Sequence, residues 1–466
     1  MLHAHPSLVS EDTFPDDPDF PQLKIASDPA LMREVFRRHL KPVAGKILRI
    51  EDCVPYRFRC RQSSTRCVLQ YTLRIVEPAT GRESNQWVSG LVYAAPGEAE
   101  QLWHELQAAD PRPEIPADWL TFEPVEFIPD LQMLVQVFPC DRKLRHLRRV
   151  LNGAARGLER LLLARLGPGR WRVEDRHLEP TRYRTELGAA LRYTMLVRDG
   201  QAAKSQTLRA YLKVYRNERG QETFELLQSL AARAGAGRQP YASVRPVIYL
   251  NELRTLVLEE APGTPLQQWL LQSGDAAEAV RAVARAVAAF NQDTLSITRQ
   301  HSLTDQFQDV KRASALVQWA CPEVRAETQA ITTAVVAGLK AVPPAPIHRD
   351  LKPDHIFLEG DRVTFIDCDS VALGDPVRDP AHLFAHLAAR VGLDAMPREQ
   401  ARAAAAAFAE EYFSRVPKSW RERFSRHCAG ALIEVADGIF RRQEPRWPRK
   451  VTACIEEAQH ALSHRN

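Results

Sequence analysis

The sequence predicts an α+β fold, in which two β-rich segments of similar pattern precede a long helical segment. Three observations lead to this prediction. Apolar and polar residues alternate in stretches such as 67–75 and 87–93, which is the pattern of half-buried strands. The same order of strands and one helix returns roughly 120 residues later. From about residue 263 the apolar residues follow a helical period, apart from one short hairpin.

Length and composition limit the classes of protein to which the chain can belong. Its 466 residues are enough for two or three domains with full cores. It is 45% hydrophobic and 26% charged, with a net charge of +5, which is ordinary for a globular protein. Its arginine clusters, such as residues 142–149, come without a nucleic-acid motif and indicate solvated helix faces. We therefore expect no nucleic-acid partner.

Targeting features and cysteines indicate a cytoplasmic protein. The first residues show no basic segment followed by an apolar run, so we expect no signal peptide. The sequence has no apolar stretch of about 18 residues that would cross a membrane, so we expect no membrane partner. The eight cysteines are scattered without a C-x-x-C pair, which favours reduced structural thiols over disulfides or zinc ligands.

The chain begins with residues 1–21, which are rich in proline and aspartate and which we expect to be disordered. The first β-rich unit follows at 22–165. A helix is predicted over 30–40, because Asp28 and Pro29 suit a helix start. Further elements are predicted as strands at 67–75, 87–93 and 133–138 and as a helix at 97–109.

The second β-rich unit, residues 166–262, repeats this order. Residues 172–175 (RVED), for example, echo residues 49–52 (RIED). We interpret the two units as a tandem duplication. The copies differ at one position, because Lys213 lies inside an apolar strand of the second copy where Leu91 stands in the first. A lysine is unusual inside a strand unless it has a partner, which makes Lys213 a candidate binding residue.

The remaining residues, 263–466, are predicted to be helical around one hairpin that holds two acidic residues. The tripeptide HRD at 348–350 is followed by a short apolar strand, a polar turn, a second apolar strand and then Asp367. Transfer of a γ-phosphoryl group needs a carboxylate that accepts the proton of the attacking hydroxyl, and further ligands that hold Mg²⁺ on the phosphates. Asp350 fits the first role and Asp367 fits the second.

Three motifs in this region occur together and in order. HRDLKPDH at 348–355, IDCDS at 366–370 and GDPVRDPAHL at 374–383 resemble the catalytic core of the aminoglycoside phosphotransferase and choline kinase-like family. That family, a branch of the protein kinase-like superfamily, has roughly the pattern H-x-D-x-x-x-x-N, then I-D, then G-D-P-x-x-D. The resemblance implies a two-lobed protein kinase-like fold at 166–466, with a β-rich N-lobe and a helical C-lobe. The unit at 22–165 is then a degenerate extra copy of the N-lobe, which we interpret as a cap or interaction domain, or alternatively as a remnant that only stabilises the fold.

The resemblance also implies ATP and Mg²⁺ as cofactors and assigns roles around the catalytic loop. Asp350 would be the catalytic base, and Asp367 would bind the metal together with His355, which stands where asparagine is commonest. A neutral imidazole binds divalent metals, although oxygen ligands suit Mg²⁺ better. Lys352 would either reach the γ-phosphate or remain a solvated loop lysine.

Two further residues are expected to support the catalytic loop. His348 would pack beneath it. Asp379 would brace the loop by hydrogen bonds, or alternatively cap the helix that begins near Pro380.

Nucleotide contacts are expected from the second β-rich unit. Lys213 would contact the α- and β-phosphates, oriented by Glu222 or Glu225, which share one face of the next predicted helix. The segment at 180–190 would cover the phosphates, although Gly188 is its only glycine and the G-x-G-x-x-G pattern is missing before Lys213. The hinge between the lobes would bind adenine through the backbone of Glu259, Glu260 and Ala261.

The spacing after Asp367 favours a small acceptor. Gly374, which begins GDPVRDP, follows too closely to leave room for the activation segment that protein kinases use as a peptide platform. We therefore expect a small hydroxylated molecule, such as a sugar, an aminoglycoside or an amino alcohol. For a cationic acceptor, four acidic residues of the late helices are either candidates for its pocket or merely solvated: Glu410, Glu411, Glu434 and Asp437.

Two other functions stay open from the sequence. A kinase-like pseudoenzyme or nucleotide-binding regulatory module is supported by the glycine-poor segment, by His355 and by the degenerate first copy. A protein kinase is supported only by the HRDLKP sequence and is opposed by the missing activation segment. The sequence predicts neither the identity of the acceptor nor the oligomeric state.

Overall fold

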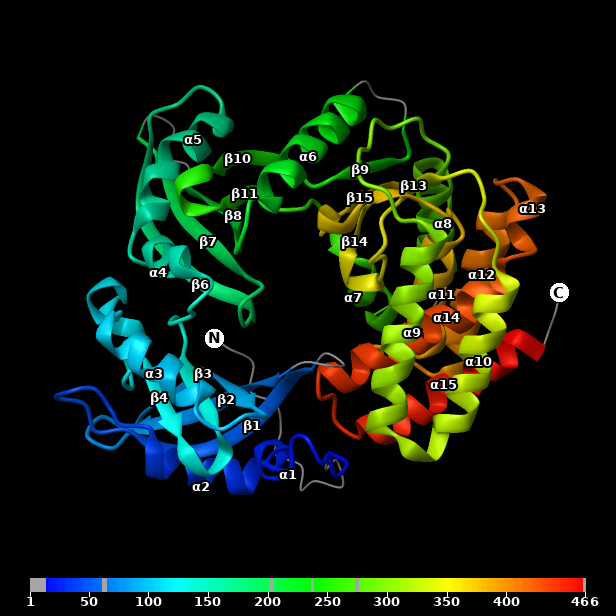
Figure 1. Ribbon diagram of the computed structural model, residues 1–466. Coiled ribbons are helices and arrows are strands. Elements are labelled where there is room, and N and C mark those ends of the chain that lie inside the picture. Colours follow the sequence, from blue (N-terminus) through cyan, green and yellow to red (C-terminus); the bar gives the residue numbers. More distant parts are fainter. Residues whose placement is uncertain (1–13, 61–64, 201–204, 236–238, 273–275, 464–466) are drawn as a thin grey trace. The chain divides into compact units, whose positions relative to one another are not determined.

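The computed structural model describes residues 14–60, 65–200, 205–235, 239–272 and 276–463 (Figure 1). The chain divides into two units. Unit 1 comprises Met1–Glu222, Pro246–Glu259 and Arg441–Pro445, and unit 2 comprises Thr223–Arg245, Glu260–Phe440 and Arg446–Asn466. Most of the segment predicted to be disordered, residues 1–13, lies outside the described residues, whereas Phe14 and Phe20 are buried. The domain boundaries predicted after residues 165 and 262 stay predictions.

The first part of unit 1 is an antiparallel sheet with the strand order β1-β2-β3-β5-β4. Its strands are β1 (Arg49–Arg59), β2 (Arg66–Glu77), β3 (Arg82–Tyr93), β4 (Val125–Ile128) and β5 (Met133–Val137). Its helices are α1 (Leu23–Ser27), α2 (Pro29–His39) and, after β3, α3 (Glu98–Ala108). The carboxylate of Asp28 accepts the amides of Ala30 and Leu31 and so caps α2, as the sequence predicts.

The second part of unit 1 is another antiparallel sheet, ordered β10-β11-β8-β7-β6. Its strands are β6 (Trp171–Arg184), β7 (Gly188–Asp199), β8 (Ser205–Tyr215), β10 (Pro246–Leu250) and β11 (Thr255–Glu259). Between the two sheets the chain forms α4 (Arg145–Leu151) and α5 (Glu159–Leu163), and after β8 it forms α6 (Arg219–Gly235). In the first sheet the third strand along the chain, β3, is followed by a helix and lies between β2 and β5. In the second sheet the third strand, β8, is likewise followed by a helix and lies between β7 and β11. The two sheets thus share one strand order.

An aromatic core joins the two sheets of unit 1. The ring of Tyr183 in β6 stacks on Trp87 of β3, with centroids 6.1 Å apart, and meets Phe138 edge-on at 5.1 Å. All three residues are buried in one apolar cluster. Such aromatic pairs add roughly 0.5–1.5 kcal/mol each beyond the effect of buried area. The β6–β7 hairpin is therefore held against the first sheet.

Unit 2 contains a mixed sheet ordered β12-β14-β15-β9 and a separate pair, β13-β16. The strands are β9 (Tyr241–Ser243), β12 (Thr264–Pro265), β13 (Ala345–Ile347), β14 (Ile356–Glu359), β15 (Arg362–Phe365) and β16 (Ala372–Gly374). The pair β14–β15 is the hairpin that the sequence predicts. Gly263 lets the chain pass close to this hairpin, because its φ is +86° and a Cβ there would lie 2.1 Å from the carbonyl oxygen of Leu358.

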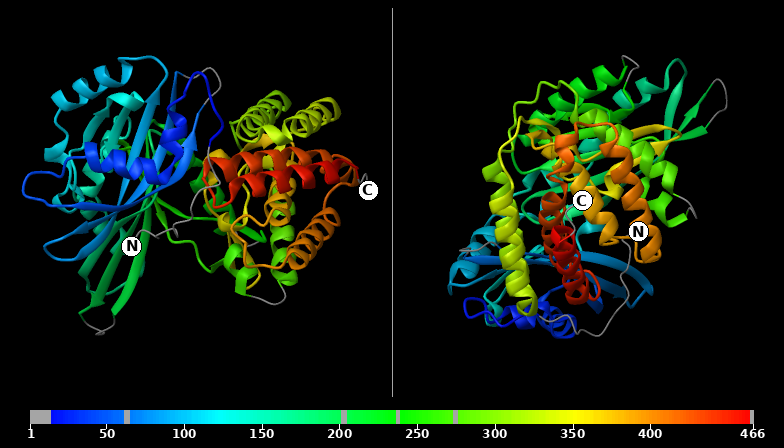
Figure 2. Two further views of the ribbon diagram at one scale, coloured as in Figure 1. Left: turned by 90° about the horizontal axis from the view of Figure 1, so that it is seen from below. Right: turned by 90° about the vertical axis from the view of Figure 1, so that its right-hand side faces the viewer.

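Unit 2 also includes α6 from Thr223 onward, and further helices make up most of the remainder (Figure 2). They are α7 (Leu266–Gln272), α8 (Ala277–Asn291), α9 (Leu303–Ala320), α10 (Arg325–Gly338), α11 (Arg378–Ala388), α12 (Arg398–Phe413), α13 (Lys418–Arg421), α14 (Phe424–Arg441) and α15 (Trp447–Ser463). Helix α12 packs against both α8 and α11. Within the described ranges, every helix is too short or too polar to cross a membrane.

Candidate active site

The register of the β14–β15 hairpin brings the ends of the predicted motif together. Ile356 pairs with Phe365 at the base of the hairpin, and the amide of Ile366 donates to the carbonyl oxygen of His355 at 3.0 Å. Asp367, the next residue, therefore follows directly on this contact. Its φ of 58° is left-handed, which is uncommon for a residue other than glycine and turns the chain sharply after β15.

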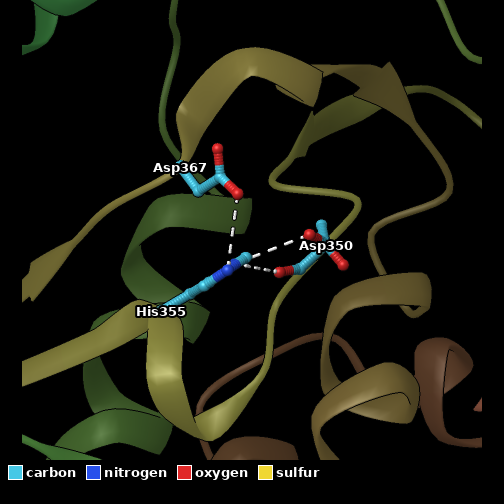
Figure 3. A group of neighbouring side chains, drawn as sticks. All are labelled: Asp350, His355 and Asp367. Carbon is cyan, nitrogen blue, oxygen red and sulfur yellow. Dashed lines mark hydrogen bonds and ion pairs between the residues drawn. The ribbon is translucent and has the colours of Figure 1, made fainter. Parts of the chain in front are cut away.

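Asp350, His355 and Asp367 form one cluster (Figure 3). Each offers a potential ligand atom, and these atoms all lie within 4.8 Å of one another. The Nε2 atom of His355 is 3.4 Å from the Asp367 carboxylate, and its Nδ1 atom is 3.6 Å from the Asp350 carboxylate. The structure thus brings together the residue predicted as the base and the two residues predicted as metal ligands.

A backbone carbonyl determines which nitrogen of His355 carries the proton. Nδ1 lies 2.8 Å from the carbonyl oxygen of Asp350, which can only accept, so Nδ1 is the donor. Burial and the charge of Lys352 lower the pKa of the imidazole, although Asp367 and Asp350 act in the opposite direction. The ring is therefore neutral at pH 7, and Nε2 directs its lone pair toward the Asp367 carboxylate.

Asp350 is ionised at neutral pH. Burial alone would raise the pKa of its carboxyl group, but Lys352, His355 and His382 lower it to about 2. The Nζ atom of Lys352 is 3.5 Å from this carboxylate, and only 13% of the lysine side chain is exposed. The ammonium group of Lys352 thus lies beside the predicted base, and the predicted contact of Lys352 with the γ-phosphate stays a prediction.

Asp379 and His348 connect the loop at 348–355 to its surroundings. The buried carboxylate of Asp379 accepts the amides of His348 at 2.6 Å and Arg349 at 2.9 Å. The Nε2 atom of His348 is in turn 2.9 Å from the carbonyl oxygen of Ile366. Asp379 lies inside α11 and is not the N-cap of that helix. These contacts hold the loop and the end of β15 in one arrangement.

Two residues that the sequence analysis missed complete this support. Asn291, at the end of α8, donates to the Asp379 carboxylate at 3.0 Å and to the carbonyl oxygen of Pro346 at 2.8 Å. The side-chain oxygen of Asn291 accepts the hydroxyl of Tyr412 at 3.1 Å. One feature of the sequence could have indicated Asn291, because it ends a helix that is rich in alanine and valine. The side-chain amide of a buried asparagine needs hydrogen-bond partners.

Two of the four acidic candidates for a cationic pocket are bound to arginines. Glu434 accepts two bonds from the buried Arg378, at 3.1 and 2.8 Å. Glu411 accepts a bond from Arg415 at 2.7 Å. A carboxylate that is paired in this way has much of its charge offset. Glu411 and Glu434 are therefore poor attractors for a cationic acceptor.

The residues predicted to bind phosphate lie on the second sheet and on the helix that follows it. Lys213 is in the interior of β8, opposite Ala190 of β7 and Leu256 of β11. Glu222 and Glu225 occupy exposed positions of α6. The choice between these two acids as the partner of Lys213 stays open.

The predicted hinge coincides with a passage between the two units. The chain leaves unit 1 after Glu259, the last residue of β11, and enters unit 2 at Glu260. The Glu259 carboxylate forms an ion pair with Arg165. The predicted adenine contact uses the backbone of Glu259, Glu260 and Ala261 and does not involve this carboxylate. That contact stays a prediction.

The tip of the segment predicted to cover the phosphates, residues 180–190, is packed against the first sheet. Glu186 is only 1% exposed, and its amide donates to the Asp141 carboxylate at 2.7 Å. The Glu186 carboxylate accepts bonds from Arg66 and Arg142, each at 2.5 Å. Burial raises the pKa of this carboxyl group, but the two arginines bring it below its usual range. The segment therefore differs from the open, glycine-rich loop that covers phosphates in kinases.

Gly188 follows this tip and begins β7 opposite Tyr215. A Cβ at Gly188 would lie 3.0 Å from the carbonyl oxygen of Val214, so the neighbouring strand passes close to it. On the other side of the tip, the hydroxyl groups of Thr185 and Ser89 are 2.6 Å apart. The predicted role of Gly188 in phosphate binding stays a prediction, whereas its neighbours Thr185 and Glu186 already have protein partners.

Comparison with known proteins identifies one family and several structures. The sequence model of the "Phosphotransferase enzyme family" matches residues 187–423. A choline/ethanolamine kinase family protein from Mesorhizobium loti is 13% identical, with a TM-score of 0.40, and the match covers 62% of this chain and 88% of that one. A choline kinase from Streptococcus pneumoniae is 13% identical, with a TM-score of 0.42 and coverages of 68% and 99%. An aminoglycoside phosphotransferase from Streptomyces rimosus is 16% identical, with a TM-score of 0.36 and coverages of 60% and 98%. The comparison with curated proteins gives no match.

Proposed function

Because this chain belongs to the phosphotransferase enzyme family, we propose that it is an ATP-dependent phosphotransferase that moves the γ-phosphate of ATP to a hydroxyl group of a small molecule. The observation that carries the proposal is the cluster of Asp350, His355 and Asp367. The cluster supplies a base and metal ligands at one place, and phosphoryl transfer depends on positioning and charge more than on covalent chemistry.

Asp350 is the proposed base. Its ionised carboxylate would orient the acceptor hydroxyl and take its proton as the hydroxyl oxygen bonds to the γ-phosphorus atom. The bond from γ-phosphorus to the bridging oxygen breaks in the same displacement, and ADP leaves. Lys352, whose Nζ atom is 3.5 Å from Asp350, would offset negative charge on the transferred phosphoryl group.

Asp367 and His355 are the proposed ligands of a divalent metal ion such as Mg²⁺, which when bound offsets the charge of the phosphates. Their donor atoms, a carboxylate oxygen and an imidazole nitrogen, are both suitable for a divalent cation. Lys213 would contact the α- and β-phosphates, with Glu222 or Glu225 as its partner. Adenine would bond to the backbone at Glu259, Glu260 and Ala261.

The proposed acceptor is a small hydroxylated molecule of the sugar, aminoglycoside or amino alcohol class. Between Asp367 and α11 the chain forms only a short 3-10 turn and β16, and β16 is paired with β13. This leaves no long segment on which a peptide substrate would lie. The mostly buried cysteines, which form no disulfide, support a cytoplasmic location.

The first sheet of unit 1 is proposed to be a degenerate copy of the N-lobe that acts as a cap for the second sheet. The shared strand order supports a duplication. Leu91 lies in β3 at the position that Lys213 has in β8, so this copy lacks the lysine that contacts phosphates. Its side chains hold Thr185 and Glu186 instead, which gives the copy a structural role at the phosphate-covering segment.

Calorimetric titration with Mg·ATP tests the proposal, followed by an assay of phosphate transfer to a panel of sugars, aminoglycosides and amino alcohols. Asp367→Asn and Lys213→Ala should each weaken binding of Mg·ATP about tenfold or more, because the first removes a proposed metal ligand and the second removes the proposed contact to the α- and β-phosphates. Two exposed residues provide matched controls: Asp361→Asn, in the turn of the same hairpin, and Lys418→Ala. A natural protein that binds no nucleotide, or variants that bind as well as their controls, would contradict the proposal.

A further inference from the structure

We infer that the cluster of Asp350, His355 and Asp367 binds divalent ions of the first transition row, such as Co²⁺ and Mn²⁺, in preference to Mg²⁺, and that His355 causes this preference. The inference deepens the proposed function and rests on it. Its basis is the donor set, in which a buried imidazole nitrogen lies between two carboxylates.

The geometry leaves Nε2 of His355 available as a ligand. Nδ1 is occupied, because it donates to the carbonyl oxygen of Asp350 at 2.8 Å. Nε2 lies 3.4 Å from the nearer carboxylate oxygen of Asp367. Two ligand atoms that are each about 2.0–2.2 Å from one ion reach such separations, so the distance suits a cation bound by both residues. Figure 3 shows the imidazole ring directed between the two carboxylates.

The imidazole is also held in place as metal-binding histidines usually are. Only 4% of the His355 side chain is exposed, and the bond from Nδ1 to a backbone carbonyl orients the ring. A bond of this kind on the nitrogen opposite the metal is a common feature of histidine ligands, and it raises the basicity of the ligating nitrogen. The ring therefore needs no rearrangement before it binds an ion.

The chemistry of the donors determines which ion is favoured. Mg²⁺ is a small, hard cation that takes oxygen ligands and retains several waters. Imidazole nitrogen binds later first-row ions more strongly, and the affinity of such sites generally rises from Mn²⁺ to Co²⁺. An asparagine at position 355 would offer an amide oxygen and favour Mg²⁺. The histidine should therefore shift the preference from Mg²⁺ toward Co²⁺ and Mn²⁺.

Titration of the full-length protein with CoCl₂ and with MgCl₂, each without nucleotide, tests the inference. The protein should bind Co²⁺ more tightly than Mg²⁺. In His355→Asn, we expect the Co²⁺ affinity to fall about tenfold or more while the Mg²⁺ affinity changes less than about threefold. The matched control is His382→Asn, which removes a buried histidine that contacts the carbonyl oxygen of Leu351 in the same loop at 3.0 Å. This control should change both affinities alike.

A second measurement does not depend on a variant that folds. Pulsed electron paramagnetic resonance of Mn²⁺ bound to the natural protein, with ¹⁵N-labelled histidine, should show a directly coordinated histidine nitrogen. The absence of such a nitrogen would overturn the inference. So would equal losses of Co²⁺ and Mg²⁺ affinity in His355→Asn, or the failure of the natural protein to bind Co²⁺ more tightly than Mg²⁺.

These results separate the inference from the proposed function. If the protein shows the metal preference and the coordinated nitrogen but transfers phosphate to none of the acceptors, the inference is supported and the proposed function is contradicted. If the protein transfers phosphate with Mg²⁺, and His355→Asn has the same preference between Co²⁺ and Mg²⁺ as the natural protein, the proposed function is supported and the inference is contradicted.

Discussion

The backbone amide of His348 donates to the carboxylate of Asp379 at 2.6 Å, and this bond joins the loop at 348–355 to the first turn of α11. The same buried carboxylate also accepts the amide of Arg349 and the side chain of Asn291. One side chain thus satisfies three donors from two distant parts of the chain. The position of Asp350, which follows Arg349, depends on this arrangement.

Asp379→Ala should lower the free energy of unfolding by about 3 kcal/mol or more, because each buried donor without an acceptor costs roughly 1–3 kcal/mol. Urea denaturation followed by circular dichroism measures this change. The control is Asp361→Ala in the exposed turn of the hairpin, which should stay within about 0.5 kcal/mol of the natural protein. If the two variants are equally stable, Asp379 does not brace the loop.

Gly263 and Gly360 allow a test of the close contact beside the catalytic hairpin. Both have a positive φ, +86° and +60°, but a Cβ at Gly263 would lie 2.1 Å from the carbonyl oxygen of Leu358, whereas a Cβ at Gly360 meets no atom within 4 Å. Gly360→Ala should cost about 1–2 kcal/mol of unfolding free energy for the backbone conformation alone. Gly263→Ala should cost about 1–3 kcal/mol more, because the backbone must also move.

Thermal denaturation of both variants under the same buffer conditions measures this difference. Equal losses of stability would mean that β12 can move away from β14 without cost, and that the contact at Leu358 does not position the hairpin.

Glu186→Gln should destabilise the folded protein by about 3 kcal/mol at pH 7, because it leaves Arg66 and Arg142 without their buried carboxylate partner. The pKa of Glu186 is lower in the folded protein than its ordinary value. Its stabilising effect is therefore present above about pH 4.3, the usual value for glutamate, and is lost as the pH falls further and the carboxylate becomes protonated in the folded protein.

Denaturant unfolding of the natural protein and Glu186→Gln between pH 7 and pH 3 tests this sign. The difference in stability should shrink on acidification. Glu100→Gln, at an exposed position of α3, should show little difference throughout. A difference for Glu186→Gln that grows as the pH falls would contradict the ion-pair explanation.

Asp350→Asn should reduce kcat at least about 100-fold, because general-base catalysis typically contributes 10²–10⁴-fold. KM for ATP should change little, since the substituted group faces the acceptor hydroxyl in the proposed function. Because the pKa of Asp350 is about 2, protonation of this group should cause no loss of activity between pH 5 and pH 8. Steady-state kinetics with the best acceptor measures kcat, KM for ATP and the pH dependence of the activity. If Asp350→Asn retains the kcat of the natural protein, Asp350 is not the base.

The β14–β15 hairpin was predictable because its parts are close in the sequence. Alternation of apolar residues indicates the two strands, and the hydrogen-bonded register of a short hairpin has few alternatives. Once Ile356 pairs with Phe365, Asp367 must follow next to His355. Local pairing therefore explains why the sequence motif led to the contact between His355 and Asp367.

The residues that the sequence did not reveal act across long distances along the chain. Tyr412 donates to Asn291, which in turn donates to Asp379, and Arg66 and Arg142 meet at Glu186. Sequence patterns indicate that such polar residues are present but not which ones share a buried site, because that depends on how helices and sheets pack.

The sequence by itself therefore determined the α+β class, the hairpin and the acidic residues at its ends, since local periodicity and short-range pairing decide these. Only the tertiary structure decided that Asn291 and Tyr412 support the bracing carboxylate of Asp379, that the tip at Glu186 is buried, and which nitrogen of His355 contacts a backbone carbonyl. Each of these depends on a hydrogen bond or an ion pair between groups that folding alone brings together.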